Sequence, residues 1–146
     1  MEIKVLKTHS DARLPEANDN TPMTGDTGYD LSAVEYVCIP PGESAVVPIG
    51  LQLAYITPGF WFRIEPRSGL GFKKSIQPHL GVIDNSYRGD LGVKLYNFHS
   101  KTYLEVAQGD RIAQLVVYPL IQAEIQFTDN IDETSRGNSG FGSTGK

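Results

Sequence analysis

Glycine and proline interrupt this chain so often that its regular elements have to be short. The 146 residues include 15 Gly and 9 Pro, which fall between runs where apolar and polar residues alternate. Such alternation is typical of strands with one buried face, and Gly and Pro are typical of the turns that join them. A chain of this length has enough apolar side chains for one core. The sequence therefore predicts one all-β domain made of many short strands.

The expected strands follow from the alternating runs. They cover residues 2–6 as an edge, then 34–39, 45–55, 60–65, 91–98, 102–106, 111–119 and 121–127, with 91–98 and 102–106 forming a hairpin. Pro48 indicates an edge or a bulge within residues 45–55. Cys38 lies between Val37 and Ile39, so we expect a buried thiol that behaves as a small hydrophobe.

Residues 129–146 differ in composition from the strands. They are rich in Gly and Ser, and Phe141 is their one aromatic residue. Such a segment cannot bury enough apolar surface to order itself. We expect residues 1–128 to form the β domain and residues 129–146 to form a flexible C-terminal arm, which is either a linker or a binding segment.

The charge and the apolar pattern exclude several functions. The formal net charge is -4, so the chain lacks the overall positive field that binds nucleic acid, although a local basic pocket for one small polyanion is compatible with it. The first residues form no apolar block of signal-peptide length, and no run of about 18 apolar residues occurs anywhere. We expect a soluble intracellular protein of cytoplasm or nucleus, or of viral origin, with neither nucleic acid nor membrane as a partner.

Residues 81–90 carry the strongest candidate for chemistry. Two apolar residues precede Asp84, and a polar turn with Tyr87 follows, so we expect a strand that ends with a carboxylate at the rim of the fold. A carboxylate held at that position can accept a proton. The alternative is a type I turn in which Asp84 or Asn85 caps its own backbone.

Three further stretches place polar side chains beside strands. Residues 67–69 combine a guanidinium, a hydroxyl and an approachable backbone, which suit a phosphate. Asp30 either caps a turn or faces a cation. Arg111 and Gln114 interrupt an otherwise buried strand, where we expect Arg111 to pair with a carboxylate and Gln114 to face a ligand. Together these groups suit a phosphate-rich ligand, a divalent cation and a water to be activated, as in a nucleotide hydrolase.

Five segments, in this order, resemble the five motifs of the trimeric deoxyuridine triphosphate nucleotidohydrolases, the dUTPases. They are Asp26-Thr27-Gly28-Tyr29-Asp30-Leu31, Pro66-Arg67-Ser68-Gly69-Leu70, Gly81-Val82-Ile83-Asp84 with Tyr87-Arg88-Gly89, Gly109-Asp110-Arg111-Ile112-Ala113-Gln114-Leu115, and Arg136-Gly137 with Gly140-Phe141-Gly142-Ser143-Thr144-Gly145. The resemblance runs from about residue 3 to the end of the chain. It implies a homotrimer of jelly-roll-like, distorted β-barrel subunits with active sites shared between chains.

The resemblance also implies a reaction. Asp84 would be the general base for a water that attacks the α-phosphorus of dUTP, giving dUMP and pyrophosphate. Asp30 would hold Mg²⁺ through coordinated waters, since this ion gives up its water shell reluctantly. The reaction would limit uracil incorporation into DNA and supply dUMP for thymidylate synthesis.

The implied substrate contacts come from several motifs. Tyr87 would lie against the deoxyribose and exclude a 2′-hydroxyl, and Phe141 would stack on uracil. Main-chain groups of Gly81, Val82, Ile83 and Gly92 would read the uracil edge. The implied phosphate contacts are Arg67, Ser68, Gly69 and Gln114, with Arg136, Gly142, Ser143 and Thr144 closing over the phosphates from another subunit. Arg111 is implied to brace a carboxylate.

Two other functions share parts of this pattern. The dCTP deaminases have the implied fold but need a catalytic Glu in the base pocket, and no Glu occurs between Glu65 and Glu105. A regulatory trimer that binds dUTP without hydrolysing it would be expected to lack Asp84 or the C-terminal motif, and both are present. We therefore expect dUTP hydrolysis.

Overall fold

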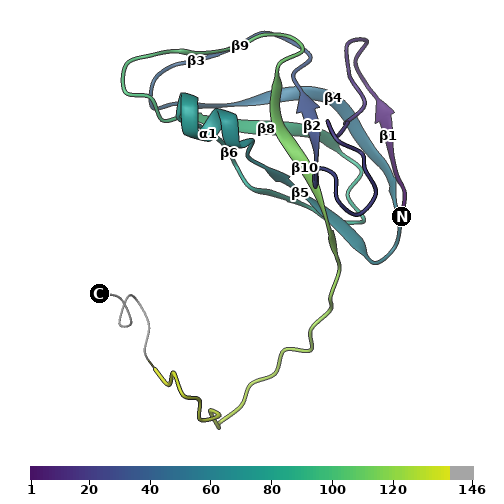
Figure 1. Cartoon of the computed structure of the whole chain (residues 1–146), viewed down its shortest axis with the longest axis vertical. Helices are drawn as coiled ribbons and strands as arrows, with labels where there is room; N and C mark the ends of the chain where they lie inside the picture. The colour runs from purple at the N-terminus through teal and green to yellow at the C-terminus, as the bar shows by residue number, and fades with distance from the viewer. Residues whose placement is uncertain (139–146) are drawn as a thin grey trace.

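The computed structural model describes residues 1–138, which form ten strands and one short helix (Figure 1). In chain order these are β1 (Ile3–Lys7), β2 (Gly28–Ser32), β3 (Val37–Ile39), β4 (Ser44–Ile56), β5 (Phe60–Glu65), α1 (Ser68–Lys74), β6 (Ile76–Pro78), β7 (Gly81–Ile83), β8 (Asp90–Asn97), β9 (Leu104–Val106) and β10 (Arg111–Pro119). All of the strand pairs are antiparallel. The expected all-β fold is confirmed, with one helix added to it.

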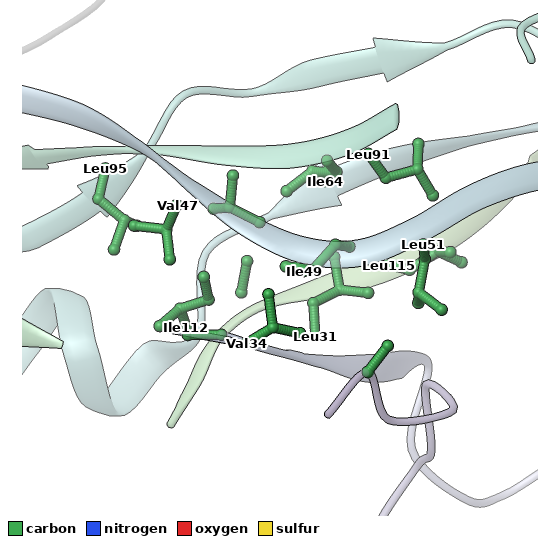
Figure 2. Packing of buried hydrophobic residues seen from close by; sticks show 14 of the residues in the cluster. Leu31, Val34, Val47, Ile49, Leu51, Ile64, Leu91, Leu95, Ile112 and Leu115 are labelled. Carbon is green, nitrogen blue, oxygen red and sulfur yellow. The ribbon is translucent and has the colours of Figure 1, made fainter. Parts of the chain in front are cut away.

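Two four-stranded sheets enclose the core. Their strand orders are β1-β4-β8-β6 and β2-β10-β5-β7, and β3 and β9 form a separate pair. Figure 2 shows Ile49 of β4 close to Leu31 of β2 and Leu115 of β10, all of which belong to one buried apolar cluster. Each such side chain contributes roughly 1.5–3 kcal/mol when fully buried, so the packing of the two sheets fixes the strand ends where the site is built.

The bulge expected at Pro48 is present. β4 pairs with both β1 and β8, and its register against β8 shifts between Pro48 and Leu51. Pro48 has no N–H for the ladder, and Gly50 in the shifted segment has a φ of 66°, which favours glycine. The expected edge position of residues 2–6 is also confirmed, since β1 ends its sheet.

The hairpin predicted for residues 91–98 and 102–106 is wrong, because β9 pairs with β3 and not with β8. Asn97, at the end of β8, is only 2% exposed. Its Nδ2 donates to the main-chain oxygens of Ile39 at 3.0 Å and Thr102 at 2.9 Å. These bonds direct the chain after β8 toward β3, so that the next strand joins β3.

The burial predicted for Cys38 is wrong. Cys38 is the middle residue of the three-residue strand β3, between half-buried Val37 and fully buried Ile39. Successive side chains of a strand point to opposite faces. Since Ile39 points into the core, Cys38 points to the outer face and is exposed.

The strand predicted for residues 121–127 is also wrong. The chain leaves the sheets after β10 and runs away from them (Figure 1), and residues 121–127 have no strand partner within the described part of the chain. Ile125 is 91% exposed and Phe127 is fully exposed. Alternation makes a segment suitable for a sheet, but a strand forms only where an edge is available to pair with it.

Helix α1 occupies a stretch for which the sequence predicted no helix. Its seven residues include Gly69 and Gly71, which lower helix propensity. It ends at Lys74 and is followed by Ser75, a left-handed C-cap residue with a φ of 54°. Lys73 and Lys74 lie in its last turn, where positive charges interact favourably with the helix dipole. No helix within residues 1–138 has the length and apolar character needed to cross a membrane.

Candidate active site

A cleft of about 980 Å³ opens where α1, β2 and β10 meet. Three of the five motif segments reach it. The lining residues that the sequence singled out are Asp30 from β2, Arg67, Ser68 and Gly69 at the start of α1, and Gln114 from β10. Segments far apart in the chain thus bring one carboxylate, one guanidinium, one hydroxyl and one amide to the same cleft.

Asp30 is held by two arginines. Arg67 Nε lies 2.7 Å from Asp30 Oδ1, and Arg111 Nη1 lies 2.9 Å from Asp30 Oδ2. The Asp30 side chain is 11% exposed, whereas that of Arg111 is 49% exposed. The pairing expected for Arg111 is confirmed, and the side chain of Asp30 caps no turn among the described residues.

Arg67 has donors left over for an anion. Its guanidinium carries five N–H groups. Three of them are engaged: Nε and Nη2 face Asp30, and Nη1 donates to the main-chain oxygen of Arg111 at 3.1 Å. The two remaining N–H groups of Arg67 can bind phosphate oxygens. Arg67 lines the cleft together with Ser68 and Gly69.

Gln114 reaches the cleft because Gly28 has no side chain. Gln114 Nε2 donates to the main-chain oxygen of Pro66 at 2.8 Å, which ties β10 to the segment before α1. A Cβ on Gly28 would overlap Gln114 Oε1 and would lie 2.6 Å from Gln114 Cδ. Glycine at position 28 is therefore needed for this position of the Gln114 amide.

The side chains that line the cleft suit a magnesium ion that keeps its waters, and not an ion coordinated by protein ligands alone. Within residues 1–138, no group of three or more His, Cys, Asp or Glu side chains could hold a metal ion. Asp30 and Asp26 are the carboxylates that line the cleft. Mg²⁺ commonly keeps several waters and binds through one or two carboxylates together with substrate phosphates. The residues present fit that kind of site.

The loop before β2 lines the cleft with residues that the sequence did not identify as candidates, chiefly Asn18. This loop is ordered by its own bonds. Asp26 N donates to Asp19 O at 2.8 Å, and Asp19 Oδ1 accepts hydrogen bonds from the hydroxyl and the main-chain N–H of Thr21. The Thr21 hydroxyl and then its N–H lower the pKa of Asp19. An Asn in a stretch of small polar residues carries no signal of such a position.

Asp84 lies in a β-turn, and its carboxylate is available. Tyr87 N donates to Asp84 O at 3.1 Å, so the backbone turn is as predicted. The capping role is wrong, because within residues 1–138 the Asp84 carboxylate accepts no hydrogen bond and forms no ion pair. The Asn85 amide instead donates to main-chain oxygens at the β4–β5 turn, with Phe60 O at 2.9 Å and Thr57 O at 3.1 Å.

Tyr87 lies in the turn that follows Asp84, with its ring beside Gly89. Its hydroxyl donates to the main-chain oxygen of Asp90 at 2.9 Å. A Cβ on Gly89 would lie 2.7 Å from Tyr87 Cζ, so glycine makes room for the ring. Arg88 Nη1 donates to Asn85 O at 2.8 Å. The ring is thus fixed in place, although Tyr87 is 41% exposed.

The backbone groups predicted to read a base lie on strand sides that have no partner strand. β7, which contains Val82, is an edge strand of its sheet, and within residues 1–138 it pairs only with β5. Gly92 of β8 is opposite Pro48 of β4, whereas β6 pairs only with Asn97, Tyr96 and Leu95 of β8. An unpaired strand side presents main-chain donors and acceptors.

Asp84 and the cleft lie apart within one chain. Ile83 pairs with Phe62 of β5, and Phe62 precedes Arg67 by five residues. At about 3.3 Å per residue, these five residues span roughly 16 Å. No residue between Gly81 and Gly92 lines the cleft among the described residues. One chain therefore does not bring the candidate base to the candidate phosphate groups.

The C-terminal motif is only partly described. Arg136 is exposed and does not line the cleft. Phe141, Gly142, Ser143 and Thr144 lie outside the described residues. The division into a domain of residues 1–128 and an arm of residues 129–146 stays a prediction.

Comparisons with known proteins agree in sequence and in fold. The family model described as dUTPase matches residues 16–145. A deoxyuridine 5'-triphosphate nucleotidohydrolase of Picosynechococcus sp. is 44% identical over 99% of both chains. The mitochondrial protein of that name from Homo sapiens is 48% identical over 92% of this chain and 54% of its own length. The Staphylococcus bacteriophage 80alpha dUTPase with dUPNHPP superposes with a TM-score of 0.87, at 28% identity over 99% of each chain.

Proposed function

The chain belongs to the dUTPase family, and we propose that it hydrolyses dUTP to dUMP and pyrophosphate at sites shared between subunits. The observation that carries this proposal is the cleft in which Arg67, Ser68 and Gln114 meet around Asp30. Full-length relatives named for this activity support the substrate. The predicted intracellular location stays a prediction.

In the proposed reaction Asp84 acts as the general base. Its free carboxylate accepts a proton from a water, the water oxygen bonds to the α-phosphorus, and the bond from that phosphorus to the bridging oxygen breaks, so that pyrophosphate leaves. The two free N–H groups of Arg67, with Ser68, Gly69 and Gln114, hold the phosphate oxygens. Asp30 would hold Mg²⁺ through waters, and the ion would supply charge neutralisation at the triphosphate.

Substrate selection is proposed to come from the Asp84 turn and the strands beside it. Free main-chain groups of β7, over Gly81, Val82 and Ile83, and of Gly92 would pair with the uracil edge. Cytosine would leave buried polar groups unpaired, which discriminates strongly. The fixed ring of Tyr87 would exclude a 2′-hydroxyl. Phe141 would stack on uracil, and Arg136, Gly142, Ser143 and Thr144 would close over the phosphates.

We propose a homotrimer because one chain does not complete the site. Asp84 follows the residue that pairs with Phe62, toward the end of β5 that is remote from Arg67, and the gap to the cleft is bridged if a neighbouring chain supplies Asp84. The exposed apolar residues Ile121, Ile125 and Phe127 also need cover, and the neighbouring subunit is the occupant that this arrangement offers. A threefold ring closes on itself and limits further association.

The first experiment measures pyrophosphate release from dUTP, dCTP, dTTP and UTP with Mg²⁺. We expect release from dUTP alone. The Asp84→Asn variant should bind nucleotide and release nothing. If the wild type binds dUTP without releasing pyrophosphate, the hydrolase proposal fails and a regulatory dUTP-binding trimer replaces it. Formation of dUTP from dCTP with release of ammonia would favour a deaminase-like enzyme, whereas pyrophosphate release from dCTP would show that the base is not selected.

A second experiment tests whether sites are shared. Asp84→Asn and Arg67→Ala chains are each expected to be inactive alone. Co-assembled in equal amounts they should recover about a quarter of the wild-type activity, since each working site needs an intact Arg67 from one chain and an intact Asp84 from its neighbour. The separately assembled variants, mixed afterwards, are the control. No recovery on co-assembly would mean that each chain builds its own site.

A further inference from the structure

Asn18 contacts the arginine that holds Asp30, although it lies outside every motif recognised in the sequence. Its Oδ1 accepts a hydrogen bond from Arg111 Nη1 at 2.8 Å, and the same nitrogen donates to Asp30 Oδ2 at 2.9 Å. An Nη group carries two hydrogens. Asn18 and Asp30 therefore engage both of them, and the guanidinium is clamped between a neutral and a charged acceptor.

Arg111 needs such a clamp because it is half exposed. Its side chain is 49% exposed, whereas Asp30 is 11% exposed. An exposed ion pair is weakened by water and by the freedom of long side chains. With Asn18 in place the guanidinium has one favoured orientation. Without it, Nη1 can turn toward solvent, and Asp30 keeps only Arg67 as a fixed partner.

The loop around Asn18 is built to hold it in place. Asp19 N donates to Asp26 Oδ2 at 3.2 Å, and Asp26 N donates to Asp19 O at 2.8 Å. Gly25 fits closely beneath this loop, because a Cβ there would lie 2.8 Å from Thr21 N. The residue that follows Asn18 is thus fixed from two sides, and Asn18 lines the cleft beside Asp30.

We propose that Asn18 is a positioning residue, which orients Arg111 so that the Asp30 carboxylate is presented to the metal–triphosphate in the cleft. The consequence for the metal rests on the proposed function, whereas the clamp on Arg111 is a property of the free protein. Outer partners of this kind change metal affinity by about 10- to 100-fold when they are removed. We expect the lower end, because Asp30 would act through water.

The test compares Asn18→Ala with Asn18→Asp, which keeps an acceptor oxygen, and with Asn20→Ala as a matched control. Asn20 lies in the same loop, and its amide donates only to Ala17 O, at 3.5 Å, among the bonds of the described residues. The readout is the affinity of Mn²⁺ for the protein with the non-hydrolysable analogue dUpNHpp, followed by electron paramagnetic resonance. We expect about tenfold weaker binding for Asn18→Ala, near wild-type binding for Asn18→Asp, and no change for Asn20→Ala.

A second arm asks whether Asn18 acts through Arg111. In an Arg111→Lys background, Asn18→Ala should have no further effect on Mn²⁺ affinity. A full effect in that background would show that Asn18 acts on the site without Arg111 and would overturn the positioning role. Unchanged affinity in Asn18→Ala would overturn it as well.

A third readout needs no nucleotide. Nitrogen-15 NMR of the free protein should show slow rotation of the Arg111 guanidinium in the wild type and faster rotation in Asn18→Ala. Equal rotation would overturn the clamp. If instead the wild type hydrolyses no dUTP while rotation differs, the proposed function fails and the clamp stands. The two failures are therefore distinguishable.

Discussion

Replacing Gly28 with Ala should destabilise the protein through one side chain, Gln114. The new Cβ would overlap Gln114 Oε1 and lie 2.6 Å from Gln114 Cδ. The Gln114 amide must then leave its bond to Pro66 O, which costs about 1 kcal/mol, and adopt a strained rotamer, which costs about 1 kcal/mol more. Alanine is favoured over glycine in a strand by about 0.5–1 kcal/mol. We expect a net loss of about 1 kcal/mol.

The same substitution should cost about 2 kcal/mol less once the Gln114 side chain is shortened to alanine. In a Gln114→Ala background the overlaps with Oε1 and Cδ are gone, the contact of 3.1 Å with the Cβ of residue 114 remains, and it opposes the strand preference for alanine of about 0.5–1 kcal/mol. The two backgrounds differ by about 2 kcal/mol, or roughly 4–8 °C in Tm for a chain of this size. Thermal unfolding of all four proteins, at one protein concentration and followed by the fluorescence of Trp61, measures this difference. Equal effects in both backgrounds would refute the overlap with Gln114 as the reason for glycine.

Three other predictions concern residues outside the cleft. Asn97→Ala should lower the free energy of unfolding by about 3 kcal/mol, measured in urea, because it leaves the buried oxygens of Ile39 and Thr102 without donors; a loss below 1 kcal/mol would contradict this. The pKa of Tyr36 is raised to about 12, chiefly by its hydrogen bond with Cys38, then by desolvation of its hydroxyl, and then by its hydrogen bond with Glu105. Its folded-state pKa is therefore above the unfolded value, so its contribution to stability is present below about pH 10 and is lost as the pH rises toward 12. Over this pH range the free energy of unfolding of Tyr36→Phe should fall less steeply with pH than that of the wild type. Cys38 should react with a water-soluble thiol reagent in the folded protein, and complete protection until unfolding would contradict its exposed position.

The strands were predictable wherever alternation alone decides the structure. β4, β5, β8 and β10 lie within a few residues of the predicted runs, because each has one face in the core. Strand pairing was less predictable. The partner of β9 depends on the side-chain bonds of Asn97. Whether residues 121–127 pair depends on where the chain goes after β10, which the alternation of these residues does not determine.

The residues of the candidate site were likewise predictable only in part. Arg67, Asp30 and Gln114 were identified because their chemistry is visible in their own segments, and the cleft brings them together. Asn18 was missed because its partner Arg111 lies 93 residues away. An isolated Asn has no signal that points to such a contact. The separation of Asp84 from the cleft likewise depends on the register of β5 and β7, which composition does not determine.

The turn that carries Asp84 also connects the two sheets, since β7 belongs to one and β8 to the other. Asn85 fixes this crossing to the β4–β5 turn without touching the cleft. A change at Asn85 would therefore be scored as a catalytic defect in an activity screen and as a folding defect in a stability screen. At most enzyme sites mutations can trade stability against activity. Mutations in the turn that carries Asp84 are expected to lower stability and activity together. Adaptive change is therefore more readily accommodated in the loop before β2, which lines the cleft but does not connect the two sheets.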